Sequence, residues 1–576
     1  MELGIYAVIA VAVIVAVAAF SKKLGVAAPI ILVVVGVGLS YLPGVPDIEV
    51  PHEIILDGVL PPILYAAAIS VPITDFRRNV GSIASLSVVL VIVTAFAAGF
   101  LLFSLLPELN LAAAIALGAI ISPPDAVAAT SIGRRLGLPP RLLTVLEGEG
   151  LLNDATALVL LRSAVAAAAV GGLTTPFAGV VDFVYAVVVA VAIGLVAGYV
   201  TVFVRSKLSD PVLDTALSIA VPFVAFAPAE ALGASGVMAV VVAGLYTGHA
   251  APTKFSAQAR ISDRINWRTI QFLLENGVFL LIGLEIRTLV DHVDPTVLSA
   301  GDAVVIGLIA LAALIVIRFL WIGPLVYFLG KREERTEKRT YEALLALYYY
   351  RSHPVSTARQ ARTRDRLERD YERRRADLEQ QRQEHIDWRG GIVLGWSGMR
   401  GVVTLAAAQS LPEDTPYRPQ LILIAFTVAV VSIVVQGGTL PWLIRLLHVQ
   451  GIDAHEDRRE LAALLEDISH VGLQALDEIE TDAATTAPID PDVIERVRRA
   501  SFLSTEAAWE RARVVRKPGE MPHQQYREIR LAVVDAERER LLELRSQGLY
   551  SSRVLAEAQA MLDLEETRLS RQTGDH

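Results

Sequence analysis

Residues 147–154 hold three acidic side chains and an asparagine within two turns of an expected helix, in the order Glu-Gly-Glu-Gly-Leu-Leu-Asn-Asp. They begin a long apolar segment, residues 141–170, that is long enough to cross a membrane as a helix. A charged side chain there costs about 2.5–3.5 kcal/mol on insertion scales, so acidic residues inside membrane helices typically mark ion pathways or proton relays. The stretch is therefore the first candidate for a functional site.

Helical spacing separates the polar groups of this stretch onto two neighbouring faces. Glu149 and Asn153 are i,i+4 neighbours, and so are Gly150 and Asp154. Asp154 therefore faces a gap beside a residue that has no side chain, which favours a functional role for its carboxylate. The alternative is a structural ion pair inside a helix bundle. For Glu149 that alternative is the favoured interpretation.

The composition predicts an all-α polytopic membrane protein with a soluble helical tail. Hydrophobic residues make up 53% of the 576 residues, and charged residues concentrate late in the chain. The absence of cysteine excludes disulfides, iron–sulfur clusters and thiolate zinc sites. The net charge of −9 combines basic loops with an acidic tail, and so indicates no nucleic-acid partner. No nucleophile–base pair or metal-ligand cluster is visible, so we expect neither an enzyme nor a cofactor.

We expect thirteen membrane spans, the first of which is retained because no basic n-region or cleavage site precedes it. The spans are expected near 3–20, 24–42, 53–71, 80–106, 110–131, 141–170, 177–204, 212–230, 234–249, 268–289, 303–329, 390–411 and 419–447. Loops between them alternate in charge, and the group from Lys254 to Arg268 belongs to the basic side. The positive-inside rule then places the N-terminus outside the cell and the tail in the cytoplasm.

Two soluble parts complete the predicted organisation. The membrane domain is expected at 1–330 and 390–447, a cytoplasmic helical insert at 331–389, and a cytoplasmic helical domain at 448–576. Within the insert, residues 359–384 predict an exposed helix or helical hairpin, whereas residues 341–350 are too short to span and are expected against the membrane or the bundle. The insert either binds anionic lipid or is a plain solvated helix. His470 and His523 are isolated in the tail, so no metal site is expected there.

Two breaks occupy matching positions when spans 1–6 and 8–13 are taken as inverted repeats. Span 5 contains Ser122-Pro-Pro-Asp125, where two prolines interrupt the helix, and span 12 contains Gly-Trp-Ser-Gly-Met-Arg400-Gly, where glycines permit unwound backbone. Interrupted helices at corresponding places mark the binding site in many transporters. Asp125 and Arg400 are placed to neutralise the exposed ends of a crossed pair of broken helices. An ordinary kink is the alternative for either motif alone.

These motifs together resemble those of the sodium/proton exchangers, the monovalent cation:proton antiporter family that includes bacterial NhaP-type proteins. The resemblance covers most of residues 50–445 and rests on an ordered set of motifs. They are Leu60-Pro-Pro-Ile-Leu, Ser122-Pro-Pro-Asp125, Glu149-Gly-Leu-Leu-Asn153-Asp154, Glu275, Arg318 and Gly398-Met-Arg400-Gly401.

The resemblance implies a homodimeric, electroneutral antiporter of the cell membrane, with roles in cation transport and pH homeostasis. It implies that Asp154 binds the cation and the proton, with Asn153 as its structural partner and Ser122, Asp125 and Gly150 near the same site. It also implies an ion pair between Glu149 and Arg318, and a place for Arg400 beside the second broken helix. One carboxylate that holds either a proton or a cation, and never both, couples the two fluxes.

Two positions depart from the family pattern. Ala66 stands where some prokaryotic relatives have an acid, and Gly150 stands where many relatives have a serine. Backbone carbonyls or water would then complete the shell around Na⁺, K⁺ or Li⁺, and the sequence does not distinguish among these cations. The alternatives to antiport are a secondary transporter of an organic anion, held by helix N-termini and Arg400, and an ion channel.

Overall fold

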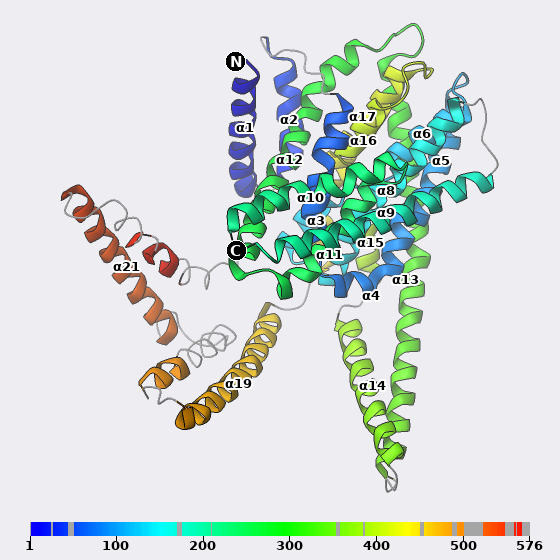
Figure 1. The fold of residues 1–576 in the computed structure, drawn as a ribbon. Helices are drawn as coiled ribbons and strands as arrows, with labels where there is room; N and C mark the ends of the chain where they lie inside the picture. The colour runs from blue at the N-terminus through cyan, green and yellow to red at the C-terminus, as the bar shows by residue number, and fades with distance from the viewer. Residues whose placement is uncertain are drawn as a thin grey trace. The chain divides into compact units, whose positions relative to one another are not determined.

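The computed structural model describes residues 2–24, 27–43, 51–169, 176–208, 210–352, 358–383, 386–449, 454–486, 492–499, 522–547, 558–559, 561–566 and 569. Every regular element within these residues is a helix (Figure 1). The chain forms two compact units, residues 1–451 and 452–576. The first unit contains all of the predicted spans, which confirms the expected all-α class.

The helices of the first unit follow the predicted spans closely. They are α1 (Glu2–Leu24), α2 (Ala28–Ser40), α3 (Leu60–Ser70), α4 (Ile73–Ala84), α5 (Val91–Leu105), α6 (Leu111–Ile121), α7 (Ala126–Leu136), α8 (Pro140–Ala169), α9 (Pro176–Arg205), α10 (Pro211–Ala231), α11 (Gly236–Lys254), α12 (Ala257–Asp291), α13 (Ala300–Ser352), α14 (Ala358–Gln383), α15 (Trp388–Trp396), α16 (Val402–Gln409), α17 (Arg418–Ser432) and α18 (Gly438–Leu447). Within the described residues, 8 helices are long and apolar enough to cross a membrane. Shorter apolar helices are α2, α3 together with the π-helical segment Ile54–Val59 before it, and α6. Crossing by all thirteen segments remains a prediction.

Two broken helices cross in the middle of the bundle. The first break separates α6 from α7 at residues 122–125, and the second separates α15 from α16 at residues 397–401. The backbone N–H of Asp125 donates to the carbonyl of Met399 over 2.5 Å, so the two unwound segments contact each other directly. Unwound backbone inside a membrane is tolerated only where protein or a water-filled cavity satisfies it. The predicted crossed pair is therefore present.

Two apolar clusters meet on α8. Leu151 and Ala155 of this helix belong to the cluster that also includes residues of α3, α9, α10 and α11. Val145 and Leu161 belong to the larger cluster, which includes α2, α5, α6, α12, α13 and α17. The helix that carries the acidic stretch is consequently held from both sides, and small residues such as Ala155 permit this close packing.

Three π-helical segments interrupt the α-helices, and the sequence pattern did not predict them. They are Ile54–Val59 before α3, Ser85–Leu90 between α4 and α5, and Ile433–Gly437 between α17 and α18. π-Helical segments shift the hydrogen-bond register of a helix and often lie at functional sites. The second of these segments precedes the carbonyl of Val91, which accepts a hydrogen bond from Ser122.

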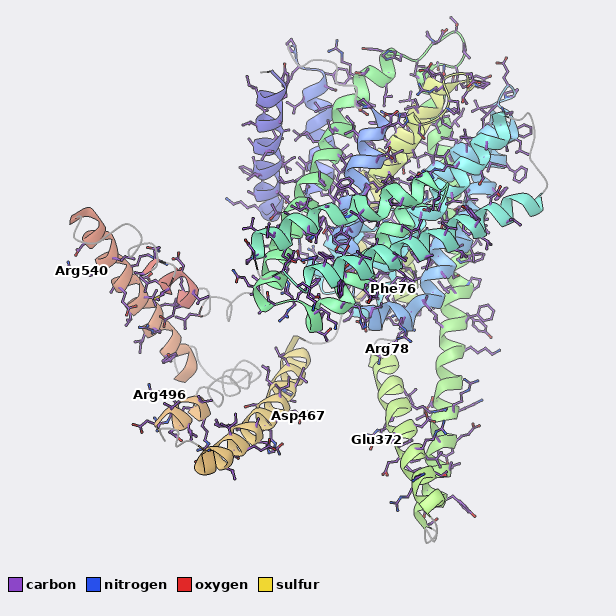
Figure 2. All side chains as sticks on the ribbon, in the orientation of Figure 1. Phe76, Arg78, Glu372, Asp467, Arg496 and Arg540 are labelled. Atoms are coloured by element: carbon purple, nitrogen blue, oxygen red, sulfur yellow. The ribbon has the colours of Figure 1, made fainter. Side chains whose placement is uncertain are left out.

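The insert forms a helical hairpin that projects from the bundle (Figure 1). α13 continues without interruption from its apolar part to Ser352 and packs against α14. Residues 341–350 were expected against the membrane or the bundle. They do not lie against the bundle, because they extend α13 and leave Tyr341, Leu345 and Tyr348 exposed, and contact with the membrane stays a prediction. Figure 2 shows side chains along this hairpin, including Glu372 on α14. Residues 359–383 form one helix, α14, so the predicted helix is confirmed, and the hairpin arises from its pairing with the end of α13.

The second unit is helical in its described residues. Its longer elements are α19 (Ala454–Thr486), a helix at 492–499, and α21 (Pro522–Gln547). Ion pairs join them: Arg498 contacts Asp477 of α19, and Arg530 of α21 contacts Glu565 in the short helix at 561–566. These contacts are exposed, so each contributes little to stability.

Candidate functional site

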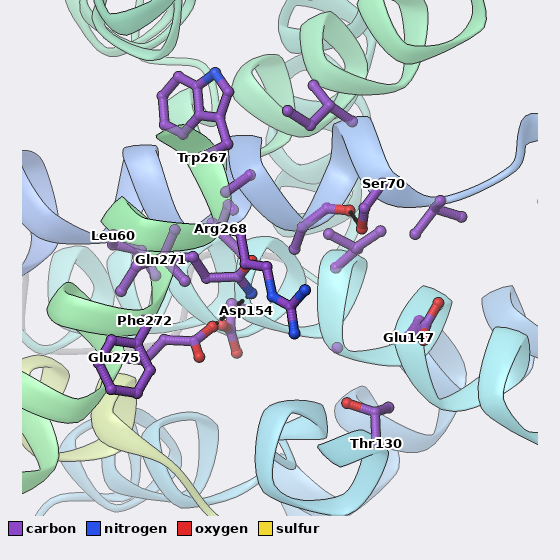
Figure 3. A pocket seen from close by; sticks show the side chains of 18 of the residues that line it. Leu60, Ser70, Thr130, Glu147, Asp154, Trp267, Arg268, Gln271, Phe272 and Glu275 are labelled. Atoms are coloured by element: carbon purple, nitrogen blue, oxygen red, sulfur yellow. Dashed lines mark hydrogen bonds between the residues drawn. The ribbon is translucent and has the colours of Figure 1, made fainter. Parts of the chain in front are cut away.

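Asp154 lines a cavity of about 870 Å³ in the first unit. The same cavity is lined by Gly150 one turn earlier on α8, by Asp125 from the first break, and by Gly401 from the second. Figure 3 shows Asp154 on the cavity lining with Glu275 of α12. Helical spacing predicted that Asp154 and Gly150 share a face, and both do line one space.

Asn153 is fully buried and fastens α8 to the first break. Its side-chain nitrogen donates to the carbonyl of Pro124, and its side-chain oxygen accepts the backbone N–H of Asp154 over 2.6 Å. The proline at 124 follows another proline, so the backbone at this break lacks amide donors and an asparagine supplies one. Asn153 therefore positions the start of α7 relative to Asp154.

Asp125 lies where the two breaks meet. Gly401 precedes the first turn of α16, and a side chain built on Gly401 would collide with the Asp125 carboxylate. The carboxylate therefore lies against the N-terminal end of α16, where unpaired N–H groups and the helix dipole favour a negative charge. Gly401 is required there because only a residue without a Cβ leaves room for the acid.

Arg400 is buried and places a positive charge at the carbonyl end of the first broken helix. Its side chain donates to the carbonyl of Ile121, the last residue of α6, over 3.0 Å, and also to the carbonyl of Gly398. Its backbone N–H donates to the hydroxyl of Ser432 on α17 over 2.9 Å. A guanidinium at the carbonyl end of a helix is stabilised by the dipole, and here it donates to a carbonyl at the end of α6 inside the bundle.

Ser122 is buried at the end of α6, but its hydroxyl is turned towards α5. It donates to the carbonyl of Val91 and accepts from the hydroxyl of Thr94, both over 3.0 Å. The structure thus places Ser122 at the crossing and gives its hydroxyl a bracing contact with α5.

Glu149 and Arg318 form a buried bidentate ion pair between α8 and α13. The two nitrogen–oxygen distances are 2.5 and 2.9 Å, and the side chains are 2% and 3% exposed. Arg318 also donates to the carbonyl of Leu394 on α15 over 3.1 Å. The pair lies away from the Asp154 face of α8, so it connects three helices around the site.

A family model described as the transmembrane sodium/hydrogen exchanger matches residues 9–446. The chain is 30% identical over 552 residues to an uncharacterized Na⁺/H⁺ exchanger of Mycobacterium tuberculosis, covering 94% of this chain and 91% of that protein. This chain belongs to the sodium/hydrogen exchanger family. It is a monovalent cation:proton antiporter, as the motifs predicted, and the organic-anion transporter and channel alternatives are not favoured.

Other exchangers agree with this assignment. A sodium, potassium, lithium and rubidium/H⁺ antiporter of Bacillus subtilis is 27% identical, with coverage of 72% of this chain and 57% of that protein. The solved structure of the sodium proton antiporter MjNhaP1 from Methanocaldococcus jannaschii has a TM-score of 0.55 at 16% identity, covering 78% of this chain and 100% of that one. The likeness to MjNhaP1 concerns the fold alone.

Several side chains of this exchanger's cavity were not predicted as site residues from the sequence. Glu275, known only from the resemblance, lines the cavity and accepts a hydrogen bond from Gln271 over 2.7 Å. The basic residues near 254–268 were interpreted as a loop. They lie instead largely on α12, which begins at Ala257, and three of these arginines line the cavity. Their spacing of four residues was the signal that would have placed them on a helix.

A buried charged cluster behind the cavity was also missed. Arg205 at the end of α9 binds both carboxylate oxygens of Asp214 on α10, over 2.7 and 2.8 Å, and Asp263 on α12 over 2.5 Å. Its guanidinium also lies 4.3 Å from the ring centre of Phe255. Asp263 lines the cavity, so the cluster joins the cavity wall to α9 and α10. No local pattern brings these three charges together.

Proposed function

We propose that Asp154 is the carboxylate that binds the cation and the proton in turn, and that exchange is electroneutral. The observation that supports this most directly is the position of Asp154 on the cavity, beside the crossed breaks and opposite the missing side chain of Gly150. A carboxylate held away from bulk water is costly while charged. Binding either a proton or a monovalent cation removes that charge.

The surrounding residues support Asp154 in this proposal. Asn153 orients the backbone of Asp154, and Asp125 and Arg400 neutralise the helix ends at the crossing. Ser122 and Gly150 belong to the cation site as positioning groups and as space for water. Glu149 and Arg318 hold α8, α13 and α15 as one body.

Coupling follows from occupancy of the single carboxylate. With a proton or a cation bound, the site is neutral, and the helices that carry it can change the side to which the cavity opens. With the carboxylate empty, the charge would have to cross an apolar region, which suppresses leak. One proton is then exchanged for one monovalent cation.

The transported cation is proposed to be Na⁺, with K⁺ and Li⁺ as further substrates. The named range of the Bacillus subtilis relative supports breadth, and so does the lack of side-chain oxygens at Ala66 and Gly150. We further propose a homodimer in the cell membrane with bound lipid. We place the N-terminus outside and the soluble domain in the cytoplasm, because the sequence predicts most of the basic residues on one side of the membrane.

The test is proton movement in sealed vesicles that contain the purified full-length protein and a pH-sensitive dye. Addition of sodium, potassium or lithium to one side of the membrane should make the opposite side more alkaline for each cation that is carried, because a proton leaves that side as the cation enters it. Asp154→Asn should abolish this signal, and Glu108→Gln, which changes an exposed acid outside the cavity, should retain it. Both variants should melt like the parent protein.

Substantial exchange by a well-folded Asp154→Asn variant would refute the assignment of Asp154. A generated membrane potential during exchange, detected with a voltage-sensitive dye, would refute electroneutrality. An inside-out orientation, measured by protease access to the soluble domain in intact cells, would refute the topology.

A further inference from the structure

Three arginines form a stripe along α12 on the lining of the cavity. Arg260, Arg264 and Arg268 are four residues apart, so they share one face and succeed one another by about 6 Å along the helix axis. All three are exposed, whereas Asp154 and Glu275 on the same cavity are more enclosed. Figure 3 shows Arg268 and Trp267 with the two carboxylates. We call these three residues the arginine stripe.

The arginine stripe has little counter-charge of its own. Arg260 donates to the carbonyl of Phe255 over 2.6 Å, and within the described residues Arg264 and Arg268 form neither a hydrogen bond nor an ion pair. Five acids line the cavity: Asp125, Asp154 and Glu275, which surround the proposed cation site, and Glu147 and Asp263, each of which is engaged elsewhere.

These two acids are bound by arginines outside the stripe. Glu147 pairs with Arg134 over 2.5 Å, and Asp263 pairs with Arg205, which also binds Asp214. The Arg134 pair is neutral, and the Arg205 cluster carries one net negative charge. With the three positive charges of the stripe, and without Asp125, Asp154 and Glu275 of the cation site itself, the stripe and these two clusters keep a net charge of about +2 by formal count.

A net positive charge is unfavourable for a cation that reaches Asp154 through this cavity. Potentials in a cleft with low-dielectric walls are focused, and they raise the local concentration of ions of the opposite sign. The stripe therefore repels the cation and attracts anions. Guanidinium groups bind phosphate oxygens through parallel N–H donors, and two arginines one turn apart can hold the same phosphate group.

We propose that Arg264 and Arg268, assisted by Arg260, bind a phosphate-bearing anion, and that its binding eases access of the cation to the site. This inference rests on the proposed function of Asp154. A soluble phosphate compound and the headgroup of an anionic lipid present the same chemistry, and the experiment separates the two sources. The cavity of about 870 Å³ has room for an anion beside the path of the cation.

Binding is tested on the purified full-length protein by thermal melting. Pyrophosphate is supplied as its N-methylglucamine salt and compared with N-methylglucamine chloride at equal ionic strength, so no transported cation is added. Pyrophosphate should raise the melting temperature of the parent protein and leave that of Arg264→Gln/Arg268→Gln unchanged. The matched control Arg77→Gln/Arg339→Gln removes two exposed arginines outside the cavity and should respond like the parent.

The effect on transport is measured as the sodium concentration for half-maximal exchange. In phosphatidylcholine vesicles, pyrophosphate should lower this concentration about threefold for the parent, because neutralising the stripe raises the local concentration of the cation. The double variant should need less sodium from the start and should not respond to pyrophosphate. If the lipid headgroup is the source, adding phosphatidylglycerol should lower the value by itself, and pyrophosphate should then add nothing.

Two results would overturn the inference. One is a melting shift in Arg264→Gln/Arg268→Gln as large as in the parent. The other is a half-maximal sodium concentration that neither pyrophosphate nor phosphatidylglycerol changes. If no protein exchanges cations for protons, the proposed function fails, and the melting experiment alone then decides the anion site.

Discussion

The buried pair of Glu149 and Arg318 should contribute several times more stability than an exposed pair of the same length. The chain offers a matched comparison, because Arg134 and Glu147 also meet at 2.5 Å but are 61% and 17% exposed. At about 4 Å between charges, attraction is about 4 kcal/mol at an effective dielectric constant of 20 and about 1 kcal/mol in water. Burial, and not distance, should therefore decide the difference.

The perturbation is a double-mutant cycle on each pair. Glu149→Gln and Arg318→Met each leave one partner buried without its counter-charge, which should destabilise the protein by about 3–5 kcal/mol. The double variant should lose clearly less than the sum, giving a coupling free energy of about 3 kcal/mol. The same cycle with Glu147→Gln and Arg134→Met should give a coupling of about 0–1 kcal/mol.

The assay is reversible unfolding in mixed micelles with increasing dodecyl sulfate, followed by tryptophan fluorescence. Arg318 also donates to the carbonyl of Leu394, so Arg318→Met should cost more than Glu149→Gln. Strict additivity in the buried cycle, or equal coupling free energies in the two cycles, would refute the reasoning from burial.

Three further substitutions test the cavity. Gly150→Ser should change the sodium:potassium preference of exchange with a normal melt if this position faces the cation, whereas a destabilised protein with the original preference would indicate a packing role. Glu275→Gln should raise the half-maximal sodium concentration about tenfold, since Glu275 supplies the acid that Ala66 lacks on the same lining, and an unchanged value would contradict this. Gly401→Ala should destabilise the protein by about 1–3 kcal/mol, because a Cβ there collides with Asp125. The control Gly38→Ala places its Cβ in open space and should leave the stability unchanged. Equal unfolding curves for the two variants would contradict a close contact between Gly401 and Asp125.

Much of the fold was predictable because membrane spans are encoded locally. Apolar length identifies α8, α9 and α13, and prolines and glycines identify the two breaks, each within a few residues. The length of α13 was not predicted, because its polar extension beyond the membrane part carries charges that are equally typical of a loop or an exposed helix. Only the packing of α13 against α14 distinguishes the two.

The candidate site was predictable where its residues lie one helical turn apart, and not where the contacts cross between helices. Gly150 and Asp154 share a face by spacing alone. The Ser122 hydroxyl donates to the carbonyl of Val91 on another helix, directly after a π-helical segment, and neither feature has a clear sequence signal. The Arg205 cluster joins α9, α10 and α12, and nothing in any one of these helices specifies the partners.

Each of the two charges at the crossing neutralises the end of the other broken helix. This arrangement leaves the carboxylate of Asp154 available for the proposed binding of a proton or a cation. Arg400, from the second break, binds the carbonyl end of α6, while Asp125, from the first break, lies at the amino end of α16. Each charge thus neutralises the helix end that belongs to the other repeat. Removing either one exposes a helix end in the partner repeat, so neither charge is free to act as the exchanging group without loosening the crossing. Asp154 lies on the unbroken helix α8 and neutralises no helix end, so the proposed mechanism can neutralise its charge with a proton or a cation while the crossing stays intact.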